Sequence, residues 1–266
     1  MAGARYDKMM LKSLRKAFRP PAAAPSVPGG TRVYAIGDIH GRLDLLDELL
    51  ERVDADHVAR GGGPAQLIFL GDLIDRGPDS AGVVTRAMHV AAALPATRFL
   101  MGNHEEVLLK VLDGDERALR FFCRVGGRET ILSYGIDVET YNALTYEELL
   151  AAFPPLVPAK HRDFIAGFSD VVVIGDYAFV HAGIRPGTLL ADQTTGDLRW
   201  IREPFLDHTG AHEKIIVHGH TITADVETRP NRIGIDTGAY VTGRLTALAL
   251  EGAERWHLRT SGAEAA

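Results

Sequence analysis

Five short segments of this 266-residue chain combine glycine with carboxylate, amide or imidazole side chains. Each lies at the end of an apolar run typical of a buried strand, and together they occupy residues 37–41, 71–77, 102–105, 181–183 and 218–221. The central one reads Gly-Asp-Leu-Ile-Asp-Arg-Gly and follows Leu67–Leu70. A glycine at that point lets the backbone turn sharply, so the next carboxylate emerges where open α/β sheets bind ligands.

These segments supply carboxylates, an amide and imidazoles, but no thiolate. Oxygen and imidazole ligands of this kind suit manganese, iron or zinc rather than a structural zinc site. Asp38 and His40 are two residues apart and face one side of an extended strand end. The ligand candidates are too many for one four-coordinate ion and predict two ions that share a carboxylate: Asp38, His40, Asp72, Asn103, His181 and His220.

Two ions about 3.5–4 Å apart clamp the attacking and leaving oxygens of an in-line phosphoryl displacement, and the water between them becomes the nucleophile. Arg76 is placed to bind the remaining phosphate oxygens. His104, directly beside Asn103, could protonate a departing alkoxide, and Asp75 could orient that imidazole and keep it protonated. One such segment alone would more often be a turn, but five in this order favour metal chemistry.

The spacing of apolar residues predicts an α/β fold that brings these segments together. Strands at 32–36, 66–70 and 98–101 are each followed by a helical pattern, and three strand–helix units in succession predict parallel pairing. Residues 113–167 are helical and irregular, which we interpret as a cap inserted over one side of the site. The later strands lie at 170–174, 177–181, 215–218, 232–235 and 244–250, with Gly175-Asp176 as a hairpin turn. The folded domain is expected to span residues 31–260.

Residues 1–30 are expected to lie outside that domain. Apolar residues recur at helical spacing within 6–19 among lysines and arginines, and a flexible Pro/Ala linker follows. One hypothesis is a basic amphipathic helix that contacts a membrane surface or a partner. The other is a disordered tail, because a helix this short is marginal alone.

Charge and cysteine content restrict the remaining classes. The net charge is −6, and residues 1–30 alone carry +5, so the rest of the chain carries −11. An acidic domain argues against nucleic acid as a partner. A single cysteine, Cys123, favours a reducing compartment and therefore the cytoplasm. The chain has no 18-residue apolar run for a transmembrane segment.

The motif set resembles the phosphoprotein phosphatase family of metallophosphoesterases, and within it the bacterial and phage serine/threonine phosphatases. The resemblance rests on residues 37–41, 71–77, 102–105, 181–186 and 219–221, and it covers roughly residues 32–250. It implies the calcineurin-like fold, a central β-sandwich flanked by helices with an inserted helical cap. The N-terminal 30 residues match nothing in that family.

The resemblance also implies a role for each site residue. One metal would bind Asp38, His40 and Asp72, and the other Asp72, Asn103, His181 and His220. His104 would be the general acid, paired with Asp75. Asn103 would also bind substrate phosphate together with two arginines, Arg76 and Arg202. The cofactor expected is a pair of divalent ions, manganese first, with iron or zinc as alternatives.

The function expected from the resemblance is hydrolysis of phosphoserine or phosphothreonine in proteins, with phosphotyrosine as a further substrate, by attack of a metal-bridging hydroxide. The alternative is hydrolysis of dinucleoside polyphosphates such as diadenosine tetraphosphate. Residues 76–80 favour that alternative, whereas Glu105 and the Trp200–Glu203 segment favour the protein phosphatase. A catalytically dead binding module would lack His104, Asp75 or a ligand, and all are present.

Overall fold

The computed structural model describes residues 24–262 and contains two five-stranded sheets. The first sheet has the order β10-β9-β1-β2-β3, with β1 parallel to β2 and β2 parallel to β3. This confirms the predicted parallel pairing. Its strands are β1 (Arg32–Ile36), β2 (Ala65–Phe69), β3 (Arg98–Phe99), β9 (Thr246–Glu251) and β10 (Glu254–Arg259).

The second sheet has the order β4-β5-β6-β8-β7, in which β5, β6 and β8 run parallel. The turn at Gly175-Asp176 joins β4 to β5 as an antiparallel hairpin, as predicted. The strands are β4 (Val171–Ile174), β5 (Tyr177–Val180), β6 (Ile215–His218), β7 (Glu227–Thr228) and β8 (Arg232–Gly234).

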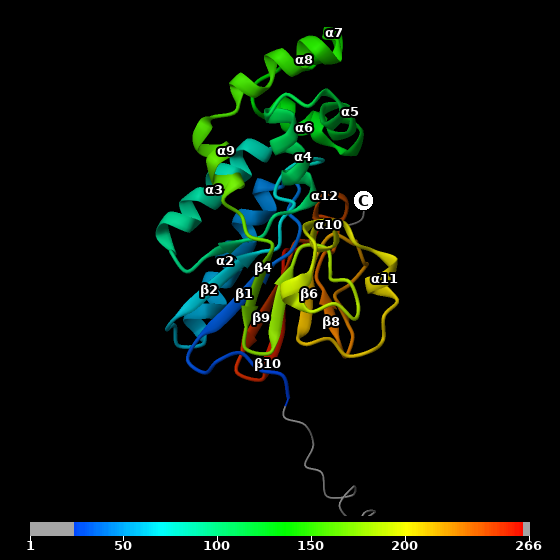
Figure 1. Ribbon diagram of the computed structural model, residues 1–266. Helices are drawn as coiled ribbons and strands as arrows, with labels where there is room; N and C mark the ends of the chain where they lie inside the picture. The colour runs from blue at the N-terminus through cyan, green and yellow to red at the C-terminus, as the bar shows by residue number, and fades with distance from the viewer. Residues whose placement is uncertain (1–23, 263–266) are drawn as a thin grey trace, which may run out of the picture.

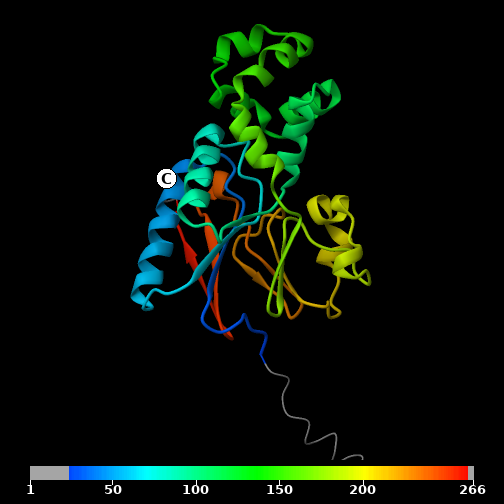
Figure 2. The same ribbon diagram turned by 60° about the vertical axis from the view of Figure 1, so that its left-hand side comes forward.

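The two sheets pack face to face, and helices cover their outer faces (Figures 1 and 2). Alternate residues of each strand divide between two cores, as the period of a strand requires. In β1, Val33 and Ala35 join the core between the sheets, whereas Tyr34 and Ile36 pack against the helices outside the first sheet. Strands buried on both faces read as continuous apolar runs, which is why the sequence showed them clearly.

Helices follow the strands of the first sheet in the order predicted. Helix α2 (Leu43–Ala59) follows β1, α3 (Ser80–Ala93) follows β2, and α4 (Asn103–Leu112) follows β3. The helical pattern in the sequence covers residues 43–53, and α2 continues six residues further because no glycine or proline interrupts it before Gly61. Two short helices cover the second sheet, α10 (Thr195–Trp200) and α11 (Glu203–Leu206). The 3-10 helix η2 (Leu190–Asp192) precedes them in the chain.

A helical segment above the upper end of the sheets fills most of the region predicted as the cap (Figure 1). Its elements are α5 (Glu116–Val125), α6 (Gly127–Ser133), α7 (Val138–Ala143), α8 (Tyr146–Ala152), η1 (Pro154–Leu156) and α9 (Ala159–Ala166). Helix α5 packs against α4, and α6 and α9 pack against α3. Helix α12 (Ala239–Thr242) follows β8.

Residues 24–30 are held by the folded part of the chain, although the sequence predicted a linker there. Val27 is only 3% exposed and joins the core between the sheets. Its N–H donates to the Gly252 carbonyl at 2.9 Å, and the Ser26 N–H donates to Asp176 at 3.0 Å. The predicted stripe at residues 6–19 lies outside the described residues. Within residues 24–262, no helix is long and apolar enough to cross a membrane.

Candidate functional site

The site lies where the carboxyl ends of parallel strands from both sheets meet. Asp38 follows β1, Asp72 follows β2, and Asn103 opens the helix after β3. From the second sheet, His181 directly follows β5 and His220 follows β6. All five side chains are buried. The edge of two packed sheets therefore gathers groups that are up to 182 residues apart, as shown by the 2.9 Å hydrogen bond from the His220 N–H to Asp38.

The backbone at these positions is strained. Within the described residues, every non-glycine residue with a positive φ belongs to the predicted site: His40, Asp72, Asp75, Arg76 and His220. Residues other than glycine rarely adopt this left-handed region, and each such residue costs about 1–3 kcal/mol. Glycines make the close packing possible, since a Cβ at Gly219 would overlap the Asp38 carboxylate. The fold thus holds the side chains in a costly arrangement that it must stabilise elsewhere.

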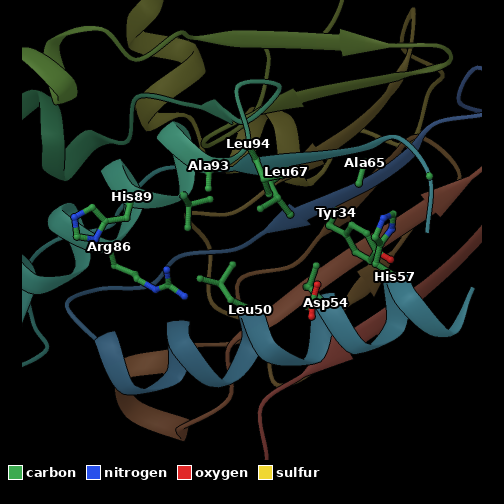
Figure 3. A pocket seen from close by; sticks show the side chains of 13 residues that line it. Tyr34, Leu50, Asp54, His57, Ala65, Leu67, Arg86, His89, Ala93 and Leu94 are labelled. Atoms are coloured by element: carbon green, nitrogen blue, oxygen red, sulfur yellow. The ribbon is translucent and has the colours of Figure 1, made fainter. Parts of the chain in front are cut away.

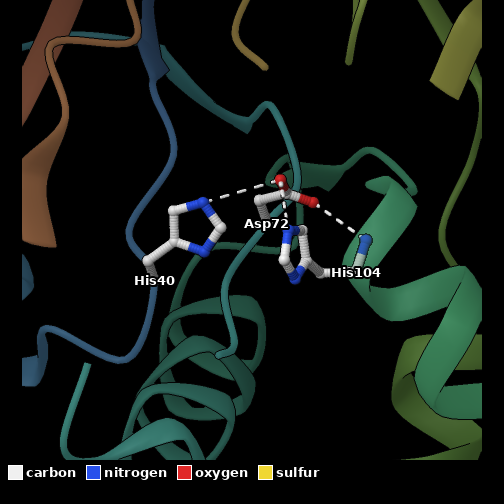
Figure 4. A group of neighbouring side chains, drawn as sticks. All are labelled: His40, Asp72 and His104. Atoms are coloured by element: carbon white, nitrogen blue, oxygen red, sulfur yellow. Dashed lines mark hydrogen bonds and ion pairs between the residues drawn. The ribbon is translucent and has the colours of Figure 1, made fainter. Parts of the chain in front are cut away.

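Asp72 lies at the centre of two groups of candidate metal ligands. One consists of His40, Asp72 and His104, and the other of Asp72, His181 and His220. Asp72 Oδ2 lies 3.7 Å from His40 Nε2 and 3.8 Å from His104 Nε2 (Figure 4), whereas Oδ1 lies 3.5 Å from His181 Nε2. Each carboxylate oxygen therefore faces a different set of imidazoles.

Backbone carbonyls fix the orientation of two of these imidazoles. His40 Nδ1 lies 2.8 Å from the Ile74 carbonyl, and His181 Nδ1 lies 2.8 Å from the Leu70 carbonyl. A carbonyl can only accept, so Nδ1 carries the proton and Nε2 turns its lone pair towards Asp72. Carbonyl contacts of this kind are the usual support of a metal-binding histidine.

Asn103 completes the second group. Its Oδ1 lies 2.9 Å from His181 Nε2 and 2.8 Å from His220 Nδ1, and these two nitrogens are 3.2 Å apart. An amide oxygen and two imidazole nitrogens therefore converge on one point. Buried Asp38 Oδ1 has no hydrogen-bond partner within the described residues, which is costly for a carboxylate. This unpaired oxygen and the convergent donors fit oxygen- and nitrogen-preferring divalent cations.

The charges of the site are unevenly distributed. Burial lowers the pKa of His40 to about 3 and that of His220 to about 2, so both are neutral and able to act as ligands. Burial alone would raise the pKa of Asp72, but the imidazoles of His181, His104 and His40 hold it well below its usual range. Burial raises the pKa of Asp38, and Asp236 and Asp72 add repulsion to it.

His104 differs from the other imidazoles of the site. Its Nδ1 lies 2.5 Å from Asp75 Oδ2, and both side chains are almost fully buried. Burial lowers the pKa of His104, but the carboxylates of Asp72 and Asp75 outweigh burial and raise it. The hydroxyl of Thr130 in α6 donates to Asp75 Oδ1 at 2.6 Å and so fixes the carboxylate from the other side. The predicted His104–Asp75 pair is therefore present as a contact.

Arg76 reaches the same space from the opposite side. Its Nη1 lies 3.0 Å from His40 Nε2, and its Nη2 lies 3.0 Å from His104 Nε2. The backbone of Arg76 donates to the Gly126 carbonyl at 2.9 Å, so the α5–α6 junction positions it. The ring of Tyr240 lies 4.9 Å from the guanidinium carbon and 5.3 Å from the His40 ring.

Arg202 is exposed and borders the site beside His220. Its Nη2 donates to the His220 carbonyl at 3.4 Å, and its Nη1 donates to the Thr221 hydroxyl at 3.2 Å. Arg185 instead forms an ion pair with Asp197 at 2.6 Å. His218 is buried under Arg232 and Phe205, away from the ligand groups.

Two buried acids near the site had no predicted role in it. From the sequence, Glu105 served only to distinguish between substrates and had no expected contact within the site. The structure shows its carboxylate accepting the N–H groups of Asp72 at 2.8 Å and Leu73 at 2.7 Å. Asp236 follows β8, is 2% exposed, and has its pKa raised to about 6 by burial. The position of Asp236 directly after a parallel strand was the sequence feature that pointed to the site. The residues that follow it are Thr-Gly, however, and include no histidine or asparagine as in the predicted segments.

Known proteins resemble this chain in sequence and in fold. The family model of calcineurin-like phosphoesterases matches residues 31–240. A symmetrical bis(5'-nucleosyl)-tetraphosphatase of Dechloromonas aromatica is 24% identical over 87% of this chain and 97% of its own. The crystal structure of a candidate diadenosine tetraphosphatase aligns with a TM-score of 0.60 at 20% identity, covering 89% of this chain and 98% of that one. A cold-active protein tyrosine phosphatase aligns with a TM-score of 0.53 at 19% identity, covering 88% and 81%.

Proposed function

Because the chain belongs to the calcineurin-like phosphoesterase family, we propose that it cleaves dinucleoside polyphosphates at a centre of two divalent cations. The observation that carries the two-cation centre is the pair of ligand groups that meet at Asp72. Each of its oxygens faces imidazoles of a different group, which is the arrangement of a bridging carboxylate. The choice of a dinucleotide rests on the sequence relatives.

The ligands divide between the two cations according to the contacts around Asp72. The first cation takes Asp38, His40 and Asp72, and the unpaired Asp38 oxygen supports this assignment. The second takes Asp72 with the three convergent donors Asn103, His181 and His220. When bound, two divalent cations would supply Lewis-acid activation of water and neutralise the charge of the substrate phosphates.

The arginines bind the oxygens of the scissile phosphate. The guanidinium of Arg76 faces the ligand groups, and its planar fork suits two phosphate oxygens at once. Arg202 approaches from the exposed rim and has room to turn towards a substrate. Asn103 contributes its amide N–H groups, because its oxygen already faces the two imidazoles.

His104 holds the proton that the leaving group needs. Asp75 accepts from Nδ1 and fixes the ring, so Nε2 is the atom that faces Asp72 and the reacting phosphate. Asp75 stabilises the imidazolium form, whose Nε2 proton then passes to the departing oxygen and leaves a neutral imidazole. The structure keeps this pair dry, because both side chains are at most 1% exposed.

The sequence relatives support a dinucleotide as substrate. The Dechloromonas aromatica relative matches this chain along nearly its whole length, so the helical segment lies within the matched region rather than outside it. Trp200 and Phe121 are half-buried, with ring centroids 6.0 Å apart. Trp200 is two residues from Arg202 and belongs to a surface that could stack on a nucleobase.

A phosphoserine or phosphothreonine protein is the second candidate substrate, and the buried His104–Asp75 pair favours it. A serine alkoxide leaves only when it is protonated, whereas a nucleotide phosphate is stable as an anion at neutral pH. An acid held this firmly therefore contributes more to cleaving an alkyl ester than an anhydride.

A direct comparison of substrates tests the proposal. Manganese-loaded protein is assayed on diadenosine tetraphosphate by chromatography and on phosphoserine peptides by phosphate release. We expect kcat/KM to be at least about tenfold higher for the dinucleotide, equivalent to about 1.4 kcal/mol in transition-state stabilisation. The Asp72→Asn variant controls for a contaminating hydrolase. Preference for the peptide would replace the dinucleotide by the second candidate, and activity retained in Asp72→Asn would overturn the two-cation centre.

A further inference from the structure

A cavity of about 310 Å³ lies between α2 and α3, against the outer face of the first sheet (Figure 3). Its floor is apolar and includes Leu50, Val53, Leu67 and Val90. Ala65, which opens β2, also lines it, whereas the catalytic groups follow the other end of that strand. The cavity is therefore separate from the cation centre, and the proposed reaction gives it no role.

The rim of this cavity exposes both apolar surface and unpaired negative charge. Leu94 lines the cavity and is 45% exposed, and Val58 beside its lining residue His57 is 65% exposed. Asp54 lines it from α2, and neither Asp54 nor the nearby Glu51 has an ion-pair partner within residues 24–262. The one arginine in the lining, Arg86, is already paired with Asp47 at 2.6 Å. A ligand for this site should accordingly be apolar on one side and basic on the other.

The chain itself contains a segment with this character. Residues 6–19 place Met10, Leu11, Leu14 and Phe18 at helical spacing, among five of the six lysines and arginines that precede residue 31. Helix α2 carries six acids, of which four pair with arginines, so Glu51 and Asp54 remain to face the basic side chains of this segment. We propose that residues 6–19 dock in the α2–α3 cavity of the same chain, with their apolar side chains inside it and their basic side chains towards Asp54 and Glu51.

The attachment point of the segment permits this docking. Val27 is fixed at the lower edge of the sheets by its bond to Gly252, which joins β9 to β10. The cavity begins two strands away, at β2, and on the outer face of the sheet. Strands are about 4.8 Å apart and packed layers about 10 Å, so the path is roughly 15 Å. Residues 24–27 are held by the sheets, so the tether is the five-residue step from Arg19 to residue 24, which spans up to about 17 Å when extended and is just sufficient.

Cross-linking in the full-length chain tests the contact. The native cysteine is removed by Cys123→Ser, and Leu14→Cys is combined with Leu94→Cys at the cavity rim. The matched control combines Leu14→Cys with Val173→Cys in β4, which is 50% exposed on the other sheet. We expect the initial rate of intramolecular disulfide formation to be at least tenfold higher for the Leu94 pair. Equal rates for the two pairs, or a disulfide formed only between two chains, would overturn the proposal.

Limited proteolysis is a second test of the docking and requires no cysteine variant. Trypsin should cleave the segment at least tenfold more slowly in the wild-type chain than in a synthetic peptide of residues 1–23. The Leu94→Gln variant should restore the rate of the peptide, whereas Val173→Thr should not. Turnover should be the same in all these proteins, which also verifies their folding. Cleavage of the wild-type chain at the rate of the peptide, or protection that requires vesicles of anionic lipid, would contradict docking.

Discussion

At the scale of single residues, His104 is distinguished from the other site histidines by its partner. His40 and His181 each turn Nδ1 to a backbone carbonyl, whereas His104 turns it to the Asp75 carboxylate. A carbonyl stabilises the charged form of an imidazole only weakly, whereas the negative charge of a carboxylate stabilises it much more. One site thus contains imidazoles suited to bind cations and one suited to hold a proton.

The first prediction follows from that difference. His104→Asn should lower kcat for an alkyl phosphate such as a phosphoserine peptide by about 10²–10⁴-fold, because general-acid catalysis is lost. The same variant should lose much less activity on an aryl phosphate, whose leaving group needs no proton. Steady-state kinetics on the two esters, with metal content measured in parallel, check this. An equal loss on both esters at unchanged metal content would disprove the acid role.

Glu105 acts on the site through Asp72. Its carboxylate accepts the N–H groups of Asp72 and Leu73, and thereby holds the turn in which Asp72 has a φ of +50°. In Glu105→Gln, the amide N–H₂ would face one of these donors and leave it unpaired. We expect metal affinity to fall about 10–100-fold, as for other residues that orient metal ligands. Metal titration by calorimetry measures the change.

The adjacent residue provides the control for this prediction. Glu106 lies on the same helix but bonds to Trp200 and Lys110 instead of the strand end. Glu106→Gln should therefore leave metal affinity unchanged. If both variants lose affinity equally, the effect belongs to the charge of α4 and not to the contact with Asp72.

At the scale of elements, the helical segment is joined to the site by α6. Thr130 bonds to Asp75, and the α5–α6 junction holds the backbone of Arg76. A polar chain also links this segment to α3. The Tyr134 hydroxyl donates to His161 Nδ1 at 3.0 Å, and His161 Nε2 lies 3.3 Å from the hydroxyl of Thr85. Because the Thr85 hydroxyl donates to the Ala81 carbonyl, it accepts from His161 Nε2. Burial lowers the pKa of His161 and so favours the neutral ring, whose Nδ1 accepts from Tyr134.

This chain of contacts predicts a pH-dependent contribution to stability. Burial lowers the pKa of His161, so the folded protein binds its proton less readily than the unfolded chain. The stabilisation of the fold by neutral His161 is therefore complete above the ordinary histidine pKa of about 6.5. It is lost as the pH falls below that value. At pH 7.5, we expect His161→Gln to lower the free energy of unfolding by about 1 kcal/mol. Urea unfolding should show this difference shrinking towards pH 5, and a constant difference would contradict it.

The sequence predicted the strands that are buried on both faces. It missed elements and residues whose contacts come from parts of the chain that are far away in the sequence. Strands buried on both faces, such as β1 and β6, have apolar runs with matching bounds. Strand β10 was missed because its residues are mostly polar. Trp256 packs against Arg60, which follows α2, and Leu258 packs on the same core. The ligand positions followed from glycines at strand ends. The role of Glu105 did not, since it depends on contacts with Asp72 and Leu73 that no local pattern encodes.

At the scale of the whole molecule, the site depends on both sheets at once, because each contributes candidate ligands to the proposed centre. Exhaustive chelation should therefore abolish activity, while leaving the apolar cores and most of the fold intact. We expect manganese to restore activity first, since the donors are oxygen and imidazole. Activity assays before and after chelation, with circular dichroism as the control for folding, test this. Full activity in metal-free protein would exclude the two-cation centre.

The folded unit also extends below the predicted boundary at residue 31. Val27 is buried between the sheets, and its N–H bonds to the turn between β9 and β10, so it closes the lower end of the core. Val27→Ala removes two methyl groups from that core and should lower the free energy of unfolding by about 2 kcal/mol. Val58→Ala, at a 65% exposed position, should change it by less than about 0.5 kcal/mol. Denaturant unfolding of the two variants measures this difference. Equal changes in the free energy of unfolding would mean that residues 24–30 are a linker, as the sequence predicted.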